Sequence, residues 1–125
     1  MHAYMPYVLA IALFAVGLYA VAVKKNLIKI IIGVIIMHHA TNLFLVLVGY
    51  RAPEAGEAMA PVAPSAAQGA GVEFAARSVD PLPQAMVLTS IVIGVSLVAL
   101  MVVMALRLHE KYGTFDLEDI RDLRG

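Results

Sequence analysis

Cysteine and tryptophan are absent from this sequence of 125 residues, and charged residues are scarce. Without cysteine the chain has no disulfide, no thiolate metal ligand and no thiol nucleophile. Nine basic residues balance nine acidic ones, so no nucleic-acid partner is expected, because such a partner requires a clustered basic surface. Hydrophobic residues make up 62% of the chain, more than a domain of this size can bury in one core. The composition therefore predicts an integral membrane protein.

Three apolar stretches are long enough to cross a bilayer, residues 4–23, 27–50 and 84–108. A helix of about 20 residues spans a hydrocarbon core of about 30 Å. The sequence therefore predicts an all-α membrane protein, a single membrane domain with three transmembrane helices. Only residues 24–26, Lys-Lys-Asn, separate the first two stretches, which predicts a tight antiparallel hairpin. The first stretch lacks the preceding basic residues of a signal peptide, so we expect it to remain in the protein.

The connection over residues 51–83 is rich in Ala, Pro, Gly and Glu and has no sustained helical period of apolar residues. This composition predicts an irregular loop outside the hydrocarbon. A short interfacial helical turn over residues 72–76 is the alternative. The connection ends in Asp-Pro-Leu-Pro, residues 80–83, which is typical of a helix start because the first turn of a helix does not need the amide hydrogen that proline lacks.

The tail, residues 109–125, is mostly polar but carries apolar residues at intervals. The pattern fits one side of a short helix at the membrane surface, formed by Phe115, Leu117, Ile120 and Leu123. We therefore treat such a helix as a hypothesis for this segment.

Basic residues predict the topology, because lysine and arginine collect on the cytoplasmic side near the ends of the spans. In this sequence they lie in the first loop and after the third span: Lys24, Lys25, Lys29, Arg107, Lys111, Arg121 and Arg124. The long connection has only Arg51 and Arg77. We predict an N-terminus outside, a cytoplasmic C-terminus, an extracytoplasmic loop 51–83 and a cytoplasmic tail 109–125.

His38 and His39 lie about 17 Å beyond the start of the second span, near the bilayer centre, where ionisable groups are costly. His38 and Asn42 share one helix face, whereas His39 points about 100° away. The imidazoles can relay a proton or cation, because imidazole titrates near neutral pH. The sequence leaves open, and favours, the alternative that these three side chains are neutral groups that hydrogen-bond between helices. No metal site is expected, since no further ligand set is visible, and no cofactor is expected.

Other residues of the spans suit contacts to polar groups or to neighbouring helices. Lys29 lies about one turn inside the second span, where its ammonium can reach the headgroups or pair with an acid of another subunit. Thr89 and Ser96 share a face of the third span, and Thr89 is the better candidate for contact with a polar pathway. Small residues that allow close helix packing are Gly17, Gly33, Ser90 and Gly94.

None of the three predicted spans contains Asp or Glu. A self-sufficient cation/proton exchanger needs a carboxylate inside the membrane to bind the cation and to exchange it for a proton. We therefore expect the chain to work with partners. Its helices leave much lateral surface for other membrane subunits and for the lipid bilayer.

Two stretches resemble the C subunit of the Mrp-type multisubunit Na+/H+ antiporter: residues 25–33, KNLIKIIIG, and residues 80–89, DPLPQAMVLT. The second is the more specific, and the resemblance covers all three spans. Residues 119–125 also resemble the end of the K subunit of respiratory complex I. Glu lies in the second and third spans of that K subunit, where this sequence has Ile35 and about Gly94. The difference favours the antiporter family.

The resemblance implies a non-catalytic subunit of a complex of different proteins in a bacterial or archaeal plasma membrane. In such a complex, large antiporter-like subunits carry the main channels for Na+ and H+, and the C subunit sits between them and helps to complete a polar path. The polar groups left for that path in this sequence are His38, His39, Asn42 and Thr89.

Two other functions remain as hypotheses. The chain can be a K-like subunit of a membrane-bound hydrogenase or of another redox complex related to complex I. Partner subunits with iron–sulfur cysteines would distinguish that complex from an antiporter. An autonomous small multidrug-type transporter is disfavoured by the missing carboxylate and by the number of spans.

Overall fold

The computed structural model describes residues 4–52, 57–62 and 71–120 of the chain. These residues form four helices, α1 (Met5–Val23), α2 (Leu27–Val48), α3 (Gly71–Arg77) and α4 (Pro81–Tyr112). Three of them, α1, α2 and α4, are long and apolar enough to cross a membrane. The prediction of an all-α membrane protein with three such helices is confirmed.

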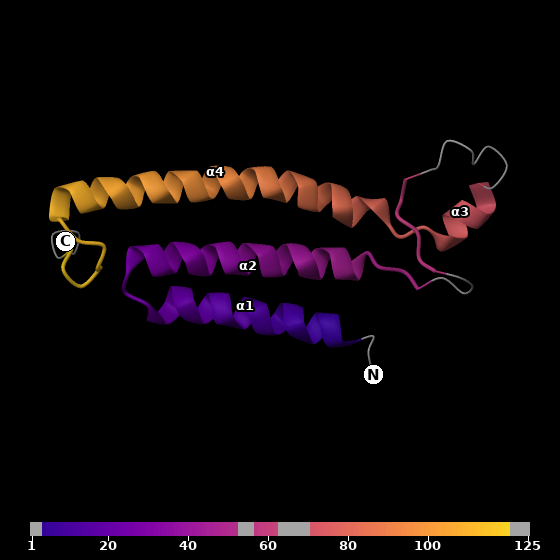
Figure 1. Cartoon of the computed structure of the whole chain (residues 1–125), viewed down its shortest axis with the longest axis horizontal. Coiled ribbons are helices and arrows are strands. Elements are labelled where there is room, and N and C mark those ends of the chain that lie inside the picture. Colours follow the sequence, from indigo (N-terminus) through magenta and orange to yellow (C-terminus); the bar gives the residue numbers. More distant parts are fainter. Residues whose placement is uncertain (1–3, 53–56, 63–70, 121–125) are drawn as a thin grey trace.

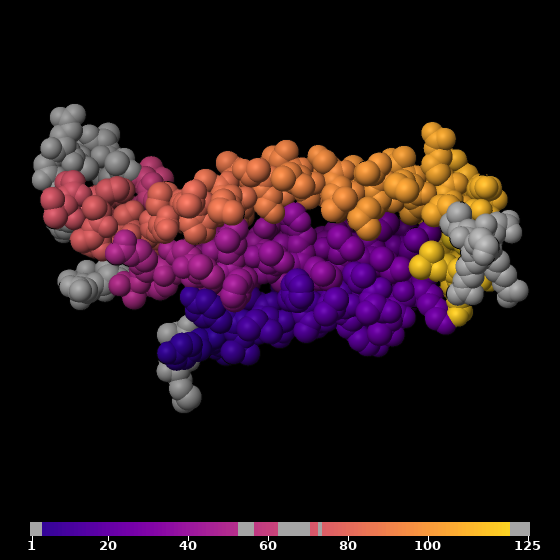
Figure 2. All heavy atoms as spheres, turned by 180° about the vertical axis from the view of Figure 1, so that it is seen from behind, coloured from indigo at the N-terminus to yellow at the C-terminus, as the bar shows by residue number. Residues whose placement is uncertain are grey.

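α2 lies between α1 and α4, and both of them pack against it. In Figure 1 the three long helices run side by side, with α1 on one side of α2 and α4 on the other. The space-filling view from behind shows the same order (Figure 2). The turn between α1 and α2 and the C-terminal end of α4 lie at the same end of the molecule (Figure 1). This arrangement makes α2 the helix that positions side chains against both neighbours.

The α1–α2 hairpin is held by close backbone contact at two glycines. A Cβ atom on Gly17 would lie 2.8 Å from the Met37 amide nitrogen and 2.9 Å from the Gly33 carbonyl oxygen. A Cβ atom on Gly33 would lie 3.0 Å from the Gly17 carbonyl oxygen. Ala10 and Ala40 are also small and are each only 1% exposed. The two helices therefore touch through their backbones, which only small residues permit.

Asn26 sets the start of α2. Its Oδ1 atom accepts hydrogen bonds from the backbone N–H groups of Ile28 (3.0 Å) and Lys29 (3.4 Å). First-turn amides have no partner within the helix, and a capping asparagine supplies one. The helix therefore begins directly after the predicted turn, and it ends at Val48, before the predicted residue 50.

α4 is longer than the predicted third span of residues 84–108. The Asp80 carboxylate accepts a hydrogen bond from the Leu82 N–H group at 2.9 Å, so the helix begins at Pro81. It ends before Gly113, whose φ of 70° is a conformation that glycine adopts easily. The helix has 32 residues and is about 48 Å long. Its ends therefore extend beyond a hydrocarbon core of about 30 Å, and the first part of the predicted tail is its last turn.

The connection between α2 and α4 contains a helix where its composition predicts an irregular loop. α3 has seven residues, so the irregular-loop interpretation is wrong for this segment. Distant backbone bonds fix its end, because the Met59 N–H group donates to the Arg77 carbonyl oxygen (3.0 Å) and the Val79 N–H group donates to that of Met59 (3.1 Å). The Arg77 guanidinium also donates to the Glu57 carbonyl oxygen, 20 residues away. Contacts between such separate segments leave no periodic pattern in the local sequence.

The chain after α4 folds back onto the turn between α1 and α2. The Leu27 N–H group donates to the Phe115 carbonyl oxygen, and the Leu117 N–H group donates to that of Lys25, each at 2.9 Å. We call this contact between residues 25–27 and 115–118 the tail clasp. It connects the far end of the chain to the start of α2.

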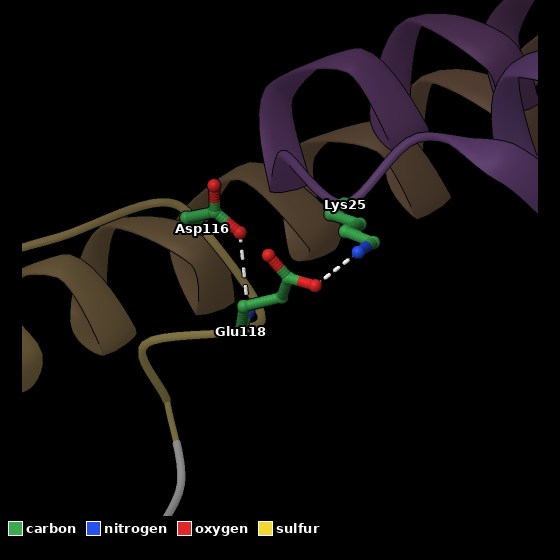
Figure 3. A network of polar contacts seen from close by, with 3 residues as sticks. All are labelled: Lys25, Asp116 and Glu118. Atoms are coloured by element: carbon green, nitrogen blue, oxygen red, sulfur yellow. Dashed lines mark hydrogen bonds and ion pairs between the residues drawn. The ribbon is translucent and has the colours of Figure 1, made fainter.

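Side chains support the tail clasp. Lys25 forms an ion pair with Glu118, whose amide donates to the Asp116 carboxylate at 3.1 Å (Figure 3). The His109 ring stacks on that of Phe115, with 4.2 Å between the ring centroids. The clasp thus joins the last turn of α4, the tail and the hairpin turn.

The hypothesis of a surface helix in the tail is wrong for the described residues, because the structure has no helix between Gly113 and Ile120. The backbone of this segment bonds to the hairpin turn at Phe115 and Leu117, and its one internal backbone bond, from the Asp119 N–H group to the Asp116 carbonyl oxygen at 3.2 Å, closes a turn and not a helix. Ile120 is 3% exposed and does not face solvent, and Leu123 lies outside the described residues.

Leu117→Pro will open the tail clasp. Proline has no amide hydrogen, so the bond to the Lys25 carbonyl oxygen is lost. We expect trypsin to cleave the purified chain after Lys25 several-fold faster, because proteolysis requires the turn to open locally. The measurement is mass spectrometry of the fragments over time.

Glu118→Gln is the matched control for Leu117→Pro. It removes only an ion pair whose side chains are 61% and 59% exposed, and such pairs contribute about 0–1 kcal/mol. Its cleavage rate should stay near that of the wild type. Equal rates for Leu117→Pro and the wild type would contradict a stabilising role of the clasp.

Candidate functional site

Polar side chains of α2 and α4 meet near the middle of α2. The Ser90 hydroxyl donates to Asn42 Oδ1 at 2.8 Å, and Ser90 Oγ lies 3.2 Å from His38 Nε2. All three side chains are half-buried. We call His38, Asn42 and Ser90 the polar cluster. His38 and Asn42 come from one face of α2, because they are four residues apart.

Gly94 leaves room for the His38 imidazole. A Cβ atom at position 94 would lie 2.5 Å from His38 Cε1 and 2.7 Å from Nε2. Ser90 and Gly94 are four residues apart, so one face of α4 presents both to α2. The ring thus occupies the space that a side chain at position 94 would fill.

His39 lies outside the polar cluster. Its Nδ1 atom is 2.8 Å from the Ile35 carbonyl oxygen of its own helix, and its ring is exposed. A carbonyl oxygen only accepts hydrogen bonds, so this Nδ1 atom carries the hydrogen and leaves Nε2 as an acceptor in the neutral ring. The ring centroids of His38 and His39 are 5.9 Å apart.

A groove of about 420 Å³ lies beside the polar cluster, between α2 and α4. His38, His39 and Asn42 line it together with apolar and small residues, including Ile35 and Gly94. The groove therefore presents imidazole and amide groups, and no carboxylate of the described residues lines it. Within the part of the chain that the structure describes, no three His, Cys, Asp or Glu side chains are grouped so that they could hold a metal ion.

The remaining candidates do not join the polar cluster. The Thr89 hydroxyl donates to the Ala85 carbonyl oxygen (3.3 Å) and that of Ser96 to the Val92 carbonyl oxygen (3.0 Å), both within α4. Thr89, Ser96 and Lys29 are all exposed. These side chains are available to a neighbouring subunit or to lipid.

Ser90 acquires a role that the sequence pattern does not give it. The pattern assigns Ser90 and Gly94 to helix packing, whereas the structure also gives Ser90 two polar partners. The signal was the matching spacing of His38 with Asn42 and of Ser90 with Gly94, which becomes informative only when the two faces are placed against each other.

Nearly the whole chain matches one known family. The family described as NADH-ubiquinone/plastoquinone oxidoreductase chain 4L matches residues 5–125. The chain belongs to this family. This 4L-family chain is 34% identical over 110 residues to the C1 subunit of the Na(+)/H(+) antiporter of Staphylococcus aureus strains JH9 and Newman, covering 87% of this chain and 85% of each relative.

The 4L-family chain is also similar to a solved structure. A chain in the structure of the membrane-bound sulfane sulfur reductase, an archaeal respiratory membrane complex, is 46% identical with a TM-score of 0.74. The match covers 91% of this chain and 94% of that chain. The resemblance to the C subunit of the Mrp-type antiporter and to its K-subunit relatives is thus confirmed, and the chain is a membrane subunit of such an antiporter or of a related respiratory complex.

Proposed function

We propose that this chain is a non-catalytic membrane subunit of a multisubunit cation/proton antiporter, packed between large antiporter-like subunits. The observation that carries the proposal is the absence of Asp and Glu from residues 4–50 and 84–108 in a relative of the antiporter C1 subunits. Without a carboxylate in the membrane, the chain lacks the group that binds a cation and exchanges it for a proton. Partner subunits supply that group.

Exposed apolar faces support a place inside a larger assembly. Leu88, Val92 and Val95 of α4 are 67%, 65% and 66% exposed, and Val8 of α1 is 62% exposed. Association of helices in a bilayer depends on packing and interhelical hydrogen bonds, so such faces suit both neighbouring helices and lipid. Other subunits of the complex and the lipid bilayer are therefore the proposed partners.

The polar cluster is the proposed contribution of this chain to the ion path. His38 and Asn42 lie mid-helix, and imidazole can both donate and accept a proton near neutral pH. His39 is a second candidate because it is exposed beside the groove. The other candidates would act at contacts with neighbouring subunits: Thr89, Ser96 and Lys29. Na+ and H+ are the proposed transported ions.

The proposed orientation has the N-terminus outside and the C-terminus in the cytoplasm of a bacterium or archaeon. The basic turn at residues 24–26 and the end of α4 with Lys111 lie at one end of the molecule (Figure 1). Lysines collect on the cytoplasmic side, which supports this orientation in the plasma membrane.

A second assembly is favoured by one specific observation, the 46% identity to a chain of an archaeal respiratory membrane complex. In that case the chain would be a K-like subunit of a membrane-bound redox complex. Its role within the membrane, as a lateral subunit with a polar cluster, would be the same. The two proposals differ in the partners that surround it.

Purification of the tagged chain in mild detergent, followed by mass spectrometry of the proteins that co-purify, tests these assemblies. We expect large antiporter-like subunits and no iron–sulfur protein. Recovery with iron–sulfur subunits would move the chain to the redox complex. Recovery without any other subunit would contradict both proposals.

His38→Gln combined with His39→Gln will alter the pH profile of antiport. Glutamine donates and accepts hydrogen bonds but does not titrate near neutral pH, so the variant keeps polar contacts and loses the change of charge. We expect the rate of Na+-driven proton movement in inside-out vesicles to depend less on pH than in the wild type.

Thr41→Val is the matched control for the histidine variant. Thr41 is an exposed α2 residue whose hydroxyl donates only to the Met37 carbonyl oxygen of its own helix, at 2.9 Å. Removal of this hydroxyl should leave the pH profile of antiport unchanged. An unchanged profile in the double histidine variant would instead favour neutral hydrogen-bonding groups between helices.

A further inference from the structure

Ser90 has one hydroxyl hydrogen and two polar partners. In the structure this hydrogen is donated to Asn42 Oδ1, so Ser90 Oγ can only accept from His38 Nε2. This arrangement requires a hydrogen on His38 Nε2. It suits both the charged imidazolium and the neutral ring that is protonated at Nε2.

A second arrangement satisfies the same three side chains. A half-turn of the Asn42 amide replaces Oδ1 by the donor Nδ2, which can then donate to Ser90 Oγ. The Ser90 hydroxyl is thereby free to donate to a bare His38 Nε2 atom. The polar cluster can therefore satisfy His38 with or without a hydrogen on Nε2, and neither helix has to move.

The position of the imidazole depends on Gly94. Any Cβ atom at position 94 would lie under 3.0 Å from Cε1 and Nε2 of the ring, so even alanine would displace it. The far end of a histidine side chain can rotate, so the displacement should cost the helix contact little. The absence of a side chain at Gly94 thus lets the ring lie at bonding distance from Ser90.

The surroundings add one titratable neighbour to His38. His39 is that neighbour, with its ring centroid 5.9 Å away and its Nδ1 atom bonded to the Ile35 carbonyl oxygen. Among the described residues, α4 presents Gly94 and apolar side chains to the groove, and α1 does not line it. The His38 imidazole lines the groove, so it is reached from there.

We propose that the polar cluster is a proton-holding centre in which Ser90 reverses its hydrogen bonds as His38 gains or loses the proton on Nε2, with Gly94 keeping the ring in place. The use of this centre for transport rests on the proposed function. His38 exchanges its proton through the groove with a proton donor or acceptor on a neighbouring subunit. Ser90 and Gly94 are positioning residues, because they act through His38.

Ser90→Ala in the whole complex tests the centre. Alanine leaves both His38 and Asn42 without the bridging group, so antiport in inside-out vesicles should fall about tenfold and its pH optimum should shift. Ser90→Thr restores the hydroxyl, so it should recover most of the antiport rate and return the pH optimum toward that of the wild type. Gly94→Ala should reproduce the shifted pH optimum with the hydroxyl present. Thr41→Val, which removes a hydroxyl bonded within α2, should match the wild type.

A second measurement does not depend on transport or on assembly. Nitrogen-15 NMR of the full chain in bilayers, labelled at histidine, reports the protonation of each ring nitrogen, and His38→Gln identifies the His38 signals. Ser90→Ala and Gly94→Ala should shift these signals, and Thr41→Val should not. Unshifted signals would overturn the centre, even if the co-purifying subunits confirm the proposed function.

The two measurements separate the centre from its use. Shifted NMR signals together with a wild-type rate and pH profile in normally assembled Ser90→Ala complexes would overturn its use in antiport. Altered signals and an altered pH profile would support both. If the chain co-purifies with a redox complex, the proposal of an antiporter subunit is wrong. The NMR result still decides whether the proton-holding centre exists.

Discussion

Gly17→Val will leave little of this protein assembled in the membrane. The Cβ atom alone would lie 2.8 Å from the Met37 amide nitrogen and 2.9 Å from the Gly33 carbonyl oxygen. These are backbone atoms and cannot rotate away, so the helices must separate. Overpacking in a core costs about 1–3 kcal/mol even where side chains can adjust. The expected cost here is at the upper end of that range or above it.

The measurement is the amount of tagged chain recovered with its partner subunits from membranes. Ala12→Val is the matched control, because it adds the same kind of side chain at an exposed position of α1. It should assemble as well as the wild type. Normal recovery of the Gly17→Val chain would show that backbone contact does not hold the hairpin.

Asn42→Leu will lower antiport by about tenfold or more. The substitution removes the partner of the Ser90 hydroxyl at 2.8 Å and places an apolar side chain beside the His38 imidazole. A polar group left without a partner in an apolar setting costs about 1–3 kcal/mol. If the polar cluster serves the ion path, the unpartnered group destabilises the state that transports ions. A destabilisation of about 1.4 kcal/mol lowers the population of that state tenfold.

Na+-driven proton movement in inside-out vesicles, corrected for the amount of assembled complex, measures this effect. Thr41→Leu is the control, since it replaces the neighbouring polar side chain, which lies outside the groove of the polar cluster. Its transport should stay close to that of the wild type. Wild-type transport by assembled Asn42→Leu complexes would remove Asn42 from the ion path.

The three long helices could be predicted from the sequence because membrane spans follow from length and apolar composition alone. The Lys-Lys-Asn turn is too short for anything except a hairpin, and Asn26 is a strong helix cap. The residues at which the helices begin and end could be predicted less well. α4 extends beyond the predicted span at both ends, because Asp80 and Gly113 decide where it begins and ends.

The rotation of α4 about its own axis could not be predicted. A helix that is apolar all round carries no periodic pattern to show which face packs against its neighbour. The sequence therefore could not distinguish Ser90, which faces His38, from the adjacent Thr89, whose hydroxyl bonds within its own helix. His38 and Asn42 could be placed on one face from their spacing of four residues, because both lie on α2.

The tail clasp was also beyond prediction, for a different reason. Its backbone bonds join Leu27 to Phe115 and Leu117 to Lys25, which lie about 90 residues apart in the chain. Bonds between main-chain atoms can form with almost any side chain and leave no mark in the sequence. The apolar spacing of the tail instead indicated a helix, and Ile120 is buried without one.

The tail clasp also orders the biosynthesis of this protein. A ribosome makes the chain from its N-terminus, so the hairpin turn leaves the ribosome long before the residues that close over it. Until Phe115 and Leu117 have been translated, the Leu27 amide and the Lys25 carbonyl must be satisfied by water or headgroups. Closure of the clasp can therefore occur only after α4 has been synthesised.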